Sequence, residues 1–117
     1  MAQNIKNVNG QWRLIHGNGF HADVNIQQAG GELTGSASRG KNDGNISINN
    51  GTGIGNVNDS VFSFVINWDD GLKWNYQGTF GLDGFLTGIT FDQDRRESQA
   101  TWVSGKTFFN LIFSPPH

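Results

Sequence analysis

The sequence predicts an all-β fold: an antiparallel, up-and-down β-barrel of eight strands that forms a single domain over residues 1–117. Three observations predict it. The composition favours strands, apolar and polar residues alternate along most of the chain, and one turn-and-strand phrase occurs twice. The phrase is Gly31-Glu32-Leu33-Thr34-Gly35 and again Gly84-Phe85-Leu86-Thr87-Gly88. In both copies we expect the first glycine to supply the positive φ of a tight hairpin turn.

The composition is typical of a small β-protein. The 117 residues include 17 glycines, 9 phenylalanines and 4 tryptophans, but 2 prolines and no cysteine. Glycine has about twice its average share of ~7%, and residues that favour helices are few. A chain of this length can bury a core without disulfides or a structural metal. The lack of cysteine excludes disulfides, thiol catalysis and thiolate metal sites.

Short runs of turn residues divide the first half of the chain into alternating segments. In the first of them, Trp12, Leu14 and His16 share one face. This period of two is the signature of a strand with one buried face. The candidate strand segments are 12–16, 20–26, 33–37, 46–48 and 53–57, with turns at 17–19, 29–31 and 49–51 and a polar loop at 39–45.

The second half contains the strongest alternation, in which Phe62, Phe64, Ile66 and Trp68 share a face. The Asp69-Asp70-Gly71 that follows is a hairpin signal. From all segments we count eight strands, with nine as the alternative. Closing them into a barrel removes exposed edges and leaves an interior for side chains or one small ligand. Candidate strand segments in this half are 62–68, 74–80, 85–91, 100–104 and 108–112, with a solvated loop at 92–97 and a turn at 105–106.

The charge and the N-terminus limit the function classes. A formal net charge of −2 gives no electrostatic footprint for nucleic acid or an anionic membrane. No apolar run approaches the length of a membrane helix, and residues 1–6 contain no signal-peptide core. We therefore expect a cytoplasmic protein, or a secreted one if a leader was removed.

Neither a metal site nor a cofactor is predicted. His16 and His21 flank a turn, but only Asp23 lies near them in the sequence to complete a ligand set. We interpret both histidines as exposed polar strand positions.

The chain is also not expected to be an enzyme. No serine lies in a nucleophile elbow, and the carboxylates Asp69-Asp70 and Asp92 with Asp94 are interpreted as solvated turn chemistry. A hydrolase or isomerase that uses Asp69 or Asp92 is the lowest-ranked hypothesis, and would need a carboxyl pair with shifted pKa values in a cleft.

The order of motifs resembles the avidin and streptavidin family of eight-stranded barrels, roughly over residues 10–108. The resemblance implies a barrel that binds biotin at its mouth and assembles into a homo-oligomer. The matching segments are Gly10-Gln11-Trp12, Gly31-Glu32-Leu33-Thr34-Gly35, Gly53-Ile54-Gly55, Phe64-Val65-Ile66-Asn67-Trp68, Tyr76-Gln77-Gly78, Ala100-Thr101-Trp102 and Gly105-Lys106-Thr107-Phe108.

Some of the family's binding positions carry over to this chain. Trp68 matches a pocket tryptophan, and Tyr76 stands where the family has another aromatic wall. Asn18 can replace the serine that binds the ureido group, because an amide both donates and accepts.

Other positions depart from the family. Leu14 replaces an asparagine and Ala37 a tyrosine that contact the ureido group, and Arg39 stands where a small serine is expected. Ile89 lies where a partner subunit would contribute or receive a tryptophan contact. Lys106 replaces an aspartate that accepts a ureido N–H, and lysine has no acceptor. These changes imply weakened biotin contacts, since each unmet buried polar group costs ~1–3 kcal/mol.

The leading hypothesis is non-enzymatic binding of a small ligand in the barrel mouth, with biotin or a biotin-like compound nominated by the resemblance. A homo-oligomer, dimer or tetramer, is expected from the family and from apolar residues on the outer face. The alternative is a carbohydrate-binding lectin that uses an exposed platform at Trp74 and Asn75 near a hairpin tip. The candidate ligand-binding residues are Asn18, Ser36 and Arg39 as polar contacts, Trp68, Tyr76 and Trp102 as walls, and Trp74 as the platform.

Overall fold

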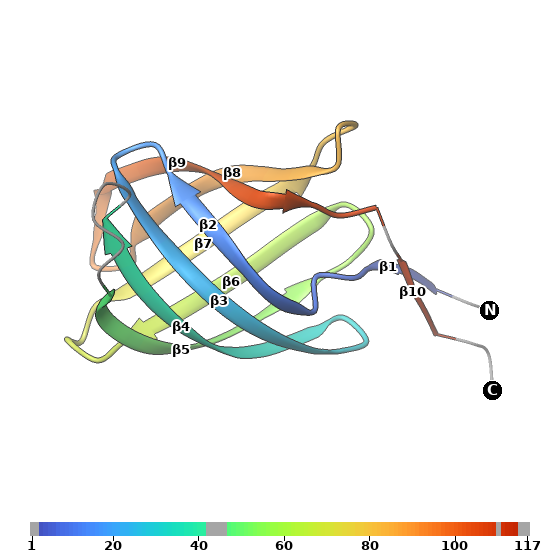
Figure 1. Cartoon of the computed structure of the whole chain (residues 1–117), viewed down its shortest axis with the longest axis horizontal. Helices are drawn as coiled ribbons and strands as arrows, with labels where there is room; N and C mark the ends of the chain where they lie inside the picture. The colour runs from blue at the N-terminus through green and yellow to red at the C-terminus, as the bar shows by residue number, and fades with distance from the viewer. Residues whose placement is uncertain (1–2, 42–46, 110, 115–117) are drawn as a thin grey trace.

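The computed structural model describes residues 3–41, 47–109 and 111–114, and its regular elements are all strands. Eight strands close into an antiparallel barrel in which sequence neighbours pair and the last strand pairs with the first (Figure 1). The predicted fold class is therefore confirmed. The barrel strands are β2 (Gly10–His16), β3 (Phe20–Ala29), β4 (Glu32–Lys41), β5 (Ser47–Val57), β6 (Val61–Trp68), β7 (Lys73–Phe80), β8 (Phe85–Asp92) and β9 (Arg95–Thr107).

Two further strands lie outside the barrel wall. Strands β1 (Gln3–Lys6) and β10 (Leu111–Ser114) pair only with each other, as an antiparallel ribbon. Figure 1 shows this ribbon and both termini at one end of the barrel, which we call the closed end. The opposite end, which we call the mouth, carries the turns at residues 17–19, 69–72 and 93–94.

Strand β5 is longer than predicted, because the turn expected at 49–51 is absent. Asn50 and Gly51 instead pair with Ser38 and Ala37 of β4. A local turn preference is small next to the hydrogen bonds that β4 and β6 supply on both sides of this segment. The loop predicted at 39–45 is also shortened, since β4 includes residues 39–41, while 42–46 lie outside the described residues.

The end of the chain also differs from the prediction. The turn predicted at 105–106 is absent, because β9 continues through it after pairing Ser104 with Leu14 of β2. The strand predicted at 108–112 is wrong as a barrel strand, since residues 108–109 are not strand and β10 pairs with β1 away from the wall. The barrel therefore closes with β9 against β2.

The two copies of the repeated phrase form turns of different geometry. Gly84 has φ of 87°, as predicted, but in the first copy the positive φ belongs to Gly30, at 60°, and not to Gly31. The first copy of the phrase, which starts at Gly31, therefore begins one residue after the positive-φ glycine of its turn. The loop predicted at 92–97 is shorter than expected, since only residues 93–94 form the turn.

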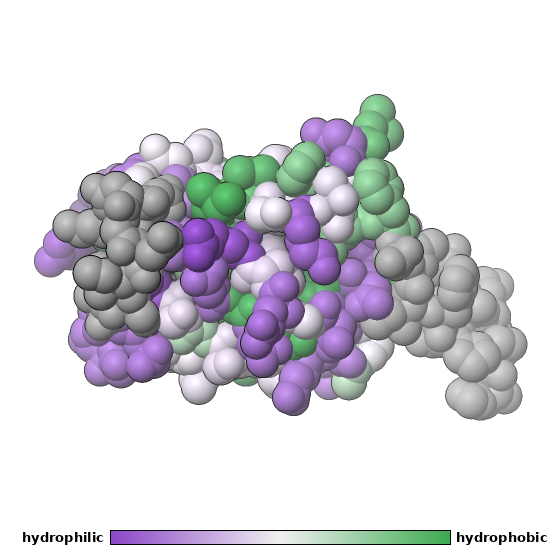
Figure 2. Space-filling model, viewed as in Figure 1, coloured by the Kyte–Doolittle hydropathy of each residue, from purple (hydrophilic) through white to green (hydrophobic). Residues whose placement is uncertain are grey.

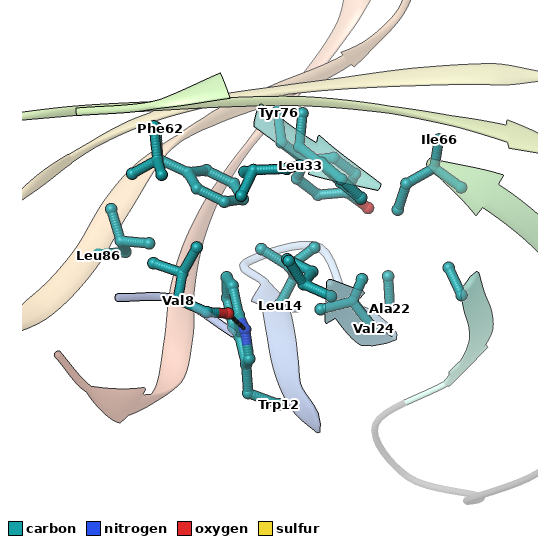
Figure 3. Close-up of a cluster of buried hydrophobic side chains, with 14 of the residues drawn as sticks. Val8, Trp12, Leu14, Ala22, Val24, Leu33, Phe62, Ile66, Tyr76 and Leu86 are labelled. Carbon is teal, nitrogen blue, oxygen red and sulfur yellow. Dashed lines mark hydrogen bonds between the residues drawn. The ribbon is translucent and has the colours of Figure 1, made fainter. Parts of the chain in front are cut away.

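Inward-facing side chains fill the centre of the barrel. Phe62 and Tyr76 are 0% exposed, and Figure 3 shows them facing Leu14 across the interior. The ring centroid of Trp102 lies 5.8 Å from that of Phe62 and 5.9 Å from that of Tyr76. Trp102 fits because Gly78 has no side chain, since a Cβ there would lie 2.7 Å from the indole. The centre of the barrel is thus packed with the chain's own aromatic groups.

The closed end is covered by the segment that precedes β2. The Trp12 indole N–H donates to the Val8 carbonyl at 2.9 Å (Figure 3), and its ring centroid lies 4.9 Å from that of Phe108. Gln28 holds the same segment, because its Oε1 accepts the Val8 N–H at 2.8 Å and its amide donates to the Lys6 carbonyl at 2.9 Å. The end that remains for a ligand is the mouth.

The outer face over β2–β5 is polar. Figure 2 shows mostly hydrophilic residues on the face that these strands present in Figure 1. Arg13 and Asp23 form an ion pair there at 2.7 Å, with side chains 41% and 44% exposed. No helix in the described residues is long and apolar enough to cross a membrane. The large hydrophobic residues exposed in the described part of the chain are Ile54, Val61, Leu82 and Phe109.

Candidate functional site

At the mouth, polar and aromatic side chains from five strands lie close together. They occupy the inward-facing positions nearest to this end of the barrel. A central strand alternates strictly, so the last inward position of each strand points into the opening. Most of these side chains are buried, although they carry hydrogen-bonding groups. The group, which we call the mouth cluster, consists of His16 (β2), Arg39 (β4), Trp68 (β6), Trp74 and Tyr76 (β7), and Thr90 and Asp92 (β8).

A hollow of about 200 Å³ opens beside Trp74. Trp74 is half-buried, and Asn18 on the β2–β3 turn and Arg95 at the start of β9 line the hollow with it. Thr90 and Asp92 reach the same hollow from β8. The hollow, which we call the mouth pocket, thus offers the aromatic surfaces of Trp74, Phe20 and Phe91, with hydroxyl, amide, carboxylate and guanidinium groups around them.

The floor of the mouth is a buried hydrogen bond between His16 Nε2 and the Tyr76 hydroxyl, at 2.8 Å. Burial, with a smaller effect from the charge of His21, lowers the pKa of His16 to about 4. Burial also raises the pKa of Tyr76 above its ordinary value. Both groups are therefore neutral at pH 7, and their bond joins β2 to β7 beneath the mouth pocket.

Arg39 is a buried cation held between two tryptophans. Its guanidinium carbon lies 5.0 Å from the ring centroid of Trp68 and 4.9 Å from that of Trp74. Its Nη2 donates to Asn49 and to the carboxylate of Asp70. The Leu72 backbone amide, and then Arg39, hold the pKa of Asp70 below its ordinary value. The cation is thus oriented by aromatic faces and by an ion pair at the rim.

Five of the predicted site residues lie in the mouth cluster or its pocket. Asn18 lines the pocket, and Arg39, Trp68, Trp74 and Tyr76 belong to the cluster. Tyr76 is fully buried and Trp68 is 4% exposed, so the two rings form packed walls and little open surface.

Two predicted residues lie elsewhere. Ser36 faces outward on β4 and lines a groove of about 660 Å³ on the outer face, because the inward position beside it belongs to Ala37. Trp102 lies deeper in the barrel, where its indole N–H donates to the Ile89 carbonyl at 2.9 Å. Lys106, aligned by the resemblance with a ligand contact, is exposed at the closed end, with its ammonium 5.2 Å from the Phe108 ring centroid.

The exposed platform predicted at Trp74 is wrong in its orientation. The Trp74 ring points into the mouth, with its centroid 5.3 Å from those of Trp68 and His16. Asn75 faces the other way, and its Oδ1 is buried without a hydrogen-bond partner in the described residues. The inward direction follows from strand parity, since Trp74 shares a face with Tyr76.

Sequence reasoning missed three groups of the mouth cluster: His16, Thr90 and Asp92. His16 is 4% exposed and Asp92 9%, and His21, outside the cluster, is 3% exposed, so the interpretation of these three positions as exposed or solvated is wrong. Parity could have identified His16, because it shares a face with Leu14. The same rule identifies Asp92 only if β8 is known to extend to this residue. In the structure it does, and the Asp92 Oδ1 accepts the Asp94 N–H at 2.9 Å.

No family model matches the chain, and a search of curated proteins finds no match.

Proposed function

We propose that this chain is a non-enzymatic binding protein that takes a small ligand in the mouth pocket. The observation that carries the proposal is the pocket of about 200 Å³ at Trp74, where Asn18, Thr90 and Asp92 converge from separate parts of the chain. Small-ligand sites usually combine such an apolar surface with a few hydrogen-bonding groups that fix orientation.

The packing beneath the pocket supports a ligand held at the opening. The bond between His16 and Tyr76 and the ring of Trp102 occupy the space below. A ligand therefore stays at the opening, with its ring against Trp74. Biotin is the first candidate ligand, because the family resemblance suggests it. Lys106 has no acceptor for a ureido N–H, but the carboxylate of Asp92 in the mouth pocket can supply one.

Binding fits the chemistry of the mouth better than catalysis does. The buried imidazole of His16 is bonded to a phenol, and burial lowers the pKa of the first and raises that of the second. Neither group exchanges a proton readily near pH 7, as a general acid or base would need to do.

A sugar is the second candidate ligand, favoured by the same pocket. The apolar face of a pyranose stacks on an indole, and its hydroxyls hydrogen-bond to carboxylate and amide groups such as those of Asp92 and Asn18. The sugar would stack on Trp74 inside the mouth, where the indole lies beside Trp68 and His16.

The test is a tryptophan fluorescence titration with biotin and then with a panel of monosaccharides. We expect a saturable change with one of them. Asp92→Asn should weaken that binding about tenfold, because its remaining oxygen accepts the Asp94 N–H and its NH2 then meets the ligand's donor, at a cost of ~1–3 kcal/mol. Glu32→Gln is the matched control, because Glu32 is exposed on β4 near the closed end. Absence of any saturable response, or equal weakening by both variants, would contradict the proposal.

A homo-oligomer also stays a proposal, supported by the family resemblance. Light scattering coupled to size-exclusion chromatography distinguishes a monomer from a dimer or tetramer of the 12.8 kDa chain.

A further inference from the structure

Buried polar atoms without a hydrogen-bond partner gather at the mouth. In the described part of the chain, four side-chain atoms are buried in this way, and three belong to the mouth cluster: Arg39 Nη1, Trp68 Nε1 and Thr90 Oγ1. Folded proteins leave few such atoms, and each one requires an explanation such as a bound water, an ion or a ligand. Their concentration at one end of the barrel points to a bound group at that end.

Two of these three atoms are donors that cannot accept. The indole Nε1 and the guanidinium Nη1 each carry N–H groups and no lone pair available for a hydrogen bond. Arg39 has an anionic partner in Asp70, but that carboxylate binds Nη2 and lies toward solvent, with its side chain 33% exposed. The second arm of the guanidinium is left without an acceptor inside the barrel.

The surroundings hold this second arm in place. The guanidinium packs on the faces of Trp68 and Trp74, and its other nitrogen is tied to Asn49 and Asp70. A donor fixed in this way loses little entropy when it binds an acceptor. Trp74 places this arm next to the mouth pocket, because its ring contacts the Arg39 guanidinium and also lines the pocket, which Arg39 and Trp68 themselves do not line.

We propose that Arg39 and Trp68 form an anion subsite, which receives a carboxylate of the ligand that binds in the mouth pocket. This inference rests on the proposed function, since it names the chemistry of that ligand. A carboxylate supplies two acceptor oxygens to the two donors and a charge opposite to that of the guanidinium. Asp92 and Thr90 then face the uncharged, hydrogen-bonding part of the same molecule. The expected ligand is a small ring compound with one carboxylate and at least one N–H or O–H donor.

The subsite is tested first with acetate, and with acetamide as its neutral counterpart. The probe signal is the indole ¹⁵N–¹H resonance of Trp68, assigned through Trp68→Phe. We expect acetate to move this resonance in a saturable way and acetamide to leave it unchanged. Absence of a shift with acetate would mean that the donors bind only water, and would overturn the subsite.

Variants locate the effect. Arg39→Gln should weaken acetate binding at least roughly tenfold, as expected for the loss of a charge-assisted hydrogen bond. Lys73→Gln removes a positive charge at the exposed start of β7, outside the mouth cluster and the mouth pocket, and should change binding by less than about twofold because exposed charges interact weakly. If Arg39→Gln does not fold, Arg39→Lys keeps the charge but not the second arm, and should still weaken binding. Equal effects of the Arg39 and Lys73 variants would overturn the assignment.

A second comparison separates this inference from the proposed function. Biotin and its primary carboxamide are titrated against the wild-type chain by calorimetry. Tighter binding of biotin, lost in Arg39→Gln, supports both proposals. Equal binding of the two compounds overturns the subsite and leaves the binding function standing. Saturable binding of acetate to a chain that binds none of the ring compounds overturns the proposed function and leaves the subsite.

Discussion

Replacing His16 by glutamine should remove a large part of the acid sensitivity of the fold. His16 is 4% exposed, and its Nε2 is hydrogen-bonded to the Tyr76 hydroxyl at 2.8 Å. Burial lowers its pKa from 6.5 to about 4. Glutamine is a suitable replacement, because its amide can still bond to the phenol of Tyr76 and carries no titratable group.

The sign and size of the effect follow from linkage. Between pH 6.5 and about 4, the unfolded chain holds a proton on this imidazole that the folded chain excludes. Stability therefore falls as the pH decreases through this interval, by ~1.4 kcal/mol for each pH unit. The full loss attributable to His16 is about 3 kcal/mol, which is a large fraction of the ~5–15 kcal/mol stability of a typical domain.

The assay is urea unfolding at pH 7.5 and at pH 4.5, followed by tryptophan fluorescence. We expect the wild type to lose about 2–3 kcal/mol more than His16→Gln between the two pH values. The lowered pKa of Asp70 also makes the stability of the fold depend on pH, because the stability it supplies is lost as the pH falls through the folded-state pKa. This loss is the same in the wild type and in His16→Gln, so it cancels in the comparison. Equal losses in the two proteins would refute the reasoning, since they would mean that the folded state protonates His16 as readily as the unfolded state does.

Three further predictions concern packing and surface charge, and all can be read from denaturation curves. Gly78→Ala should destabilise the barrel by about 1–3 kcal/mol, because its Cβ would lie 2.7 Å from the Trp102 ring; an unchanged midpoint would contradict this. Leu14→Ala should cost about 2–5 kcal/mol, since the side chain is 0% exposed at the barrel centre, and a loss well below that range would show that the interior collapses around it. Arg13→Gln should cost less than about 1 kcal/mol, because the pair with Asp23 is more than 40% exposed on both sides; a larger, salt-insensitive loss would argue against this view.

Local patterns in the sequence were sufficient for the barrel class and for the direction of most side chains. The alternation at Phe62, Phe64 and Ile66 predicts a buried face, and these residues are 0% exposed. Alternation is reliable because the side-chain period of a strand is set by the backbone alone. The same rule explains why Trp68 and Trp102 were correctly placed on inward positions.

Strand ends were predicted less well, because they depend on partners that are distant in the sequence. Residues 49–51 and 105–106 have the composition of turns, yet both segments are in strands. A turn preference is a local energy of a few tenths to ~1 kcal/mol, whereas ladder pairing adds hydrogen bonds from neighbouring strands. The prediction for Asp92 failed for the same reason, since it required the true end of β8.

The sequence by itself determined that this chain is an antiparallel β-barrel and which face of most strands is inward. Only the tertiary structure decided which inward residues meet. The bond between His16 and Tyr76 joins residues 60 positions apart, and the guanidinium of Arg39 packs on Trp68 and Trp74 from other strands. Such contacts depend on how eight strands are staggered when the barrel closes, which alternation within one strand does not specify.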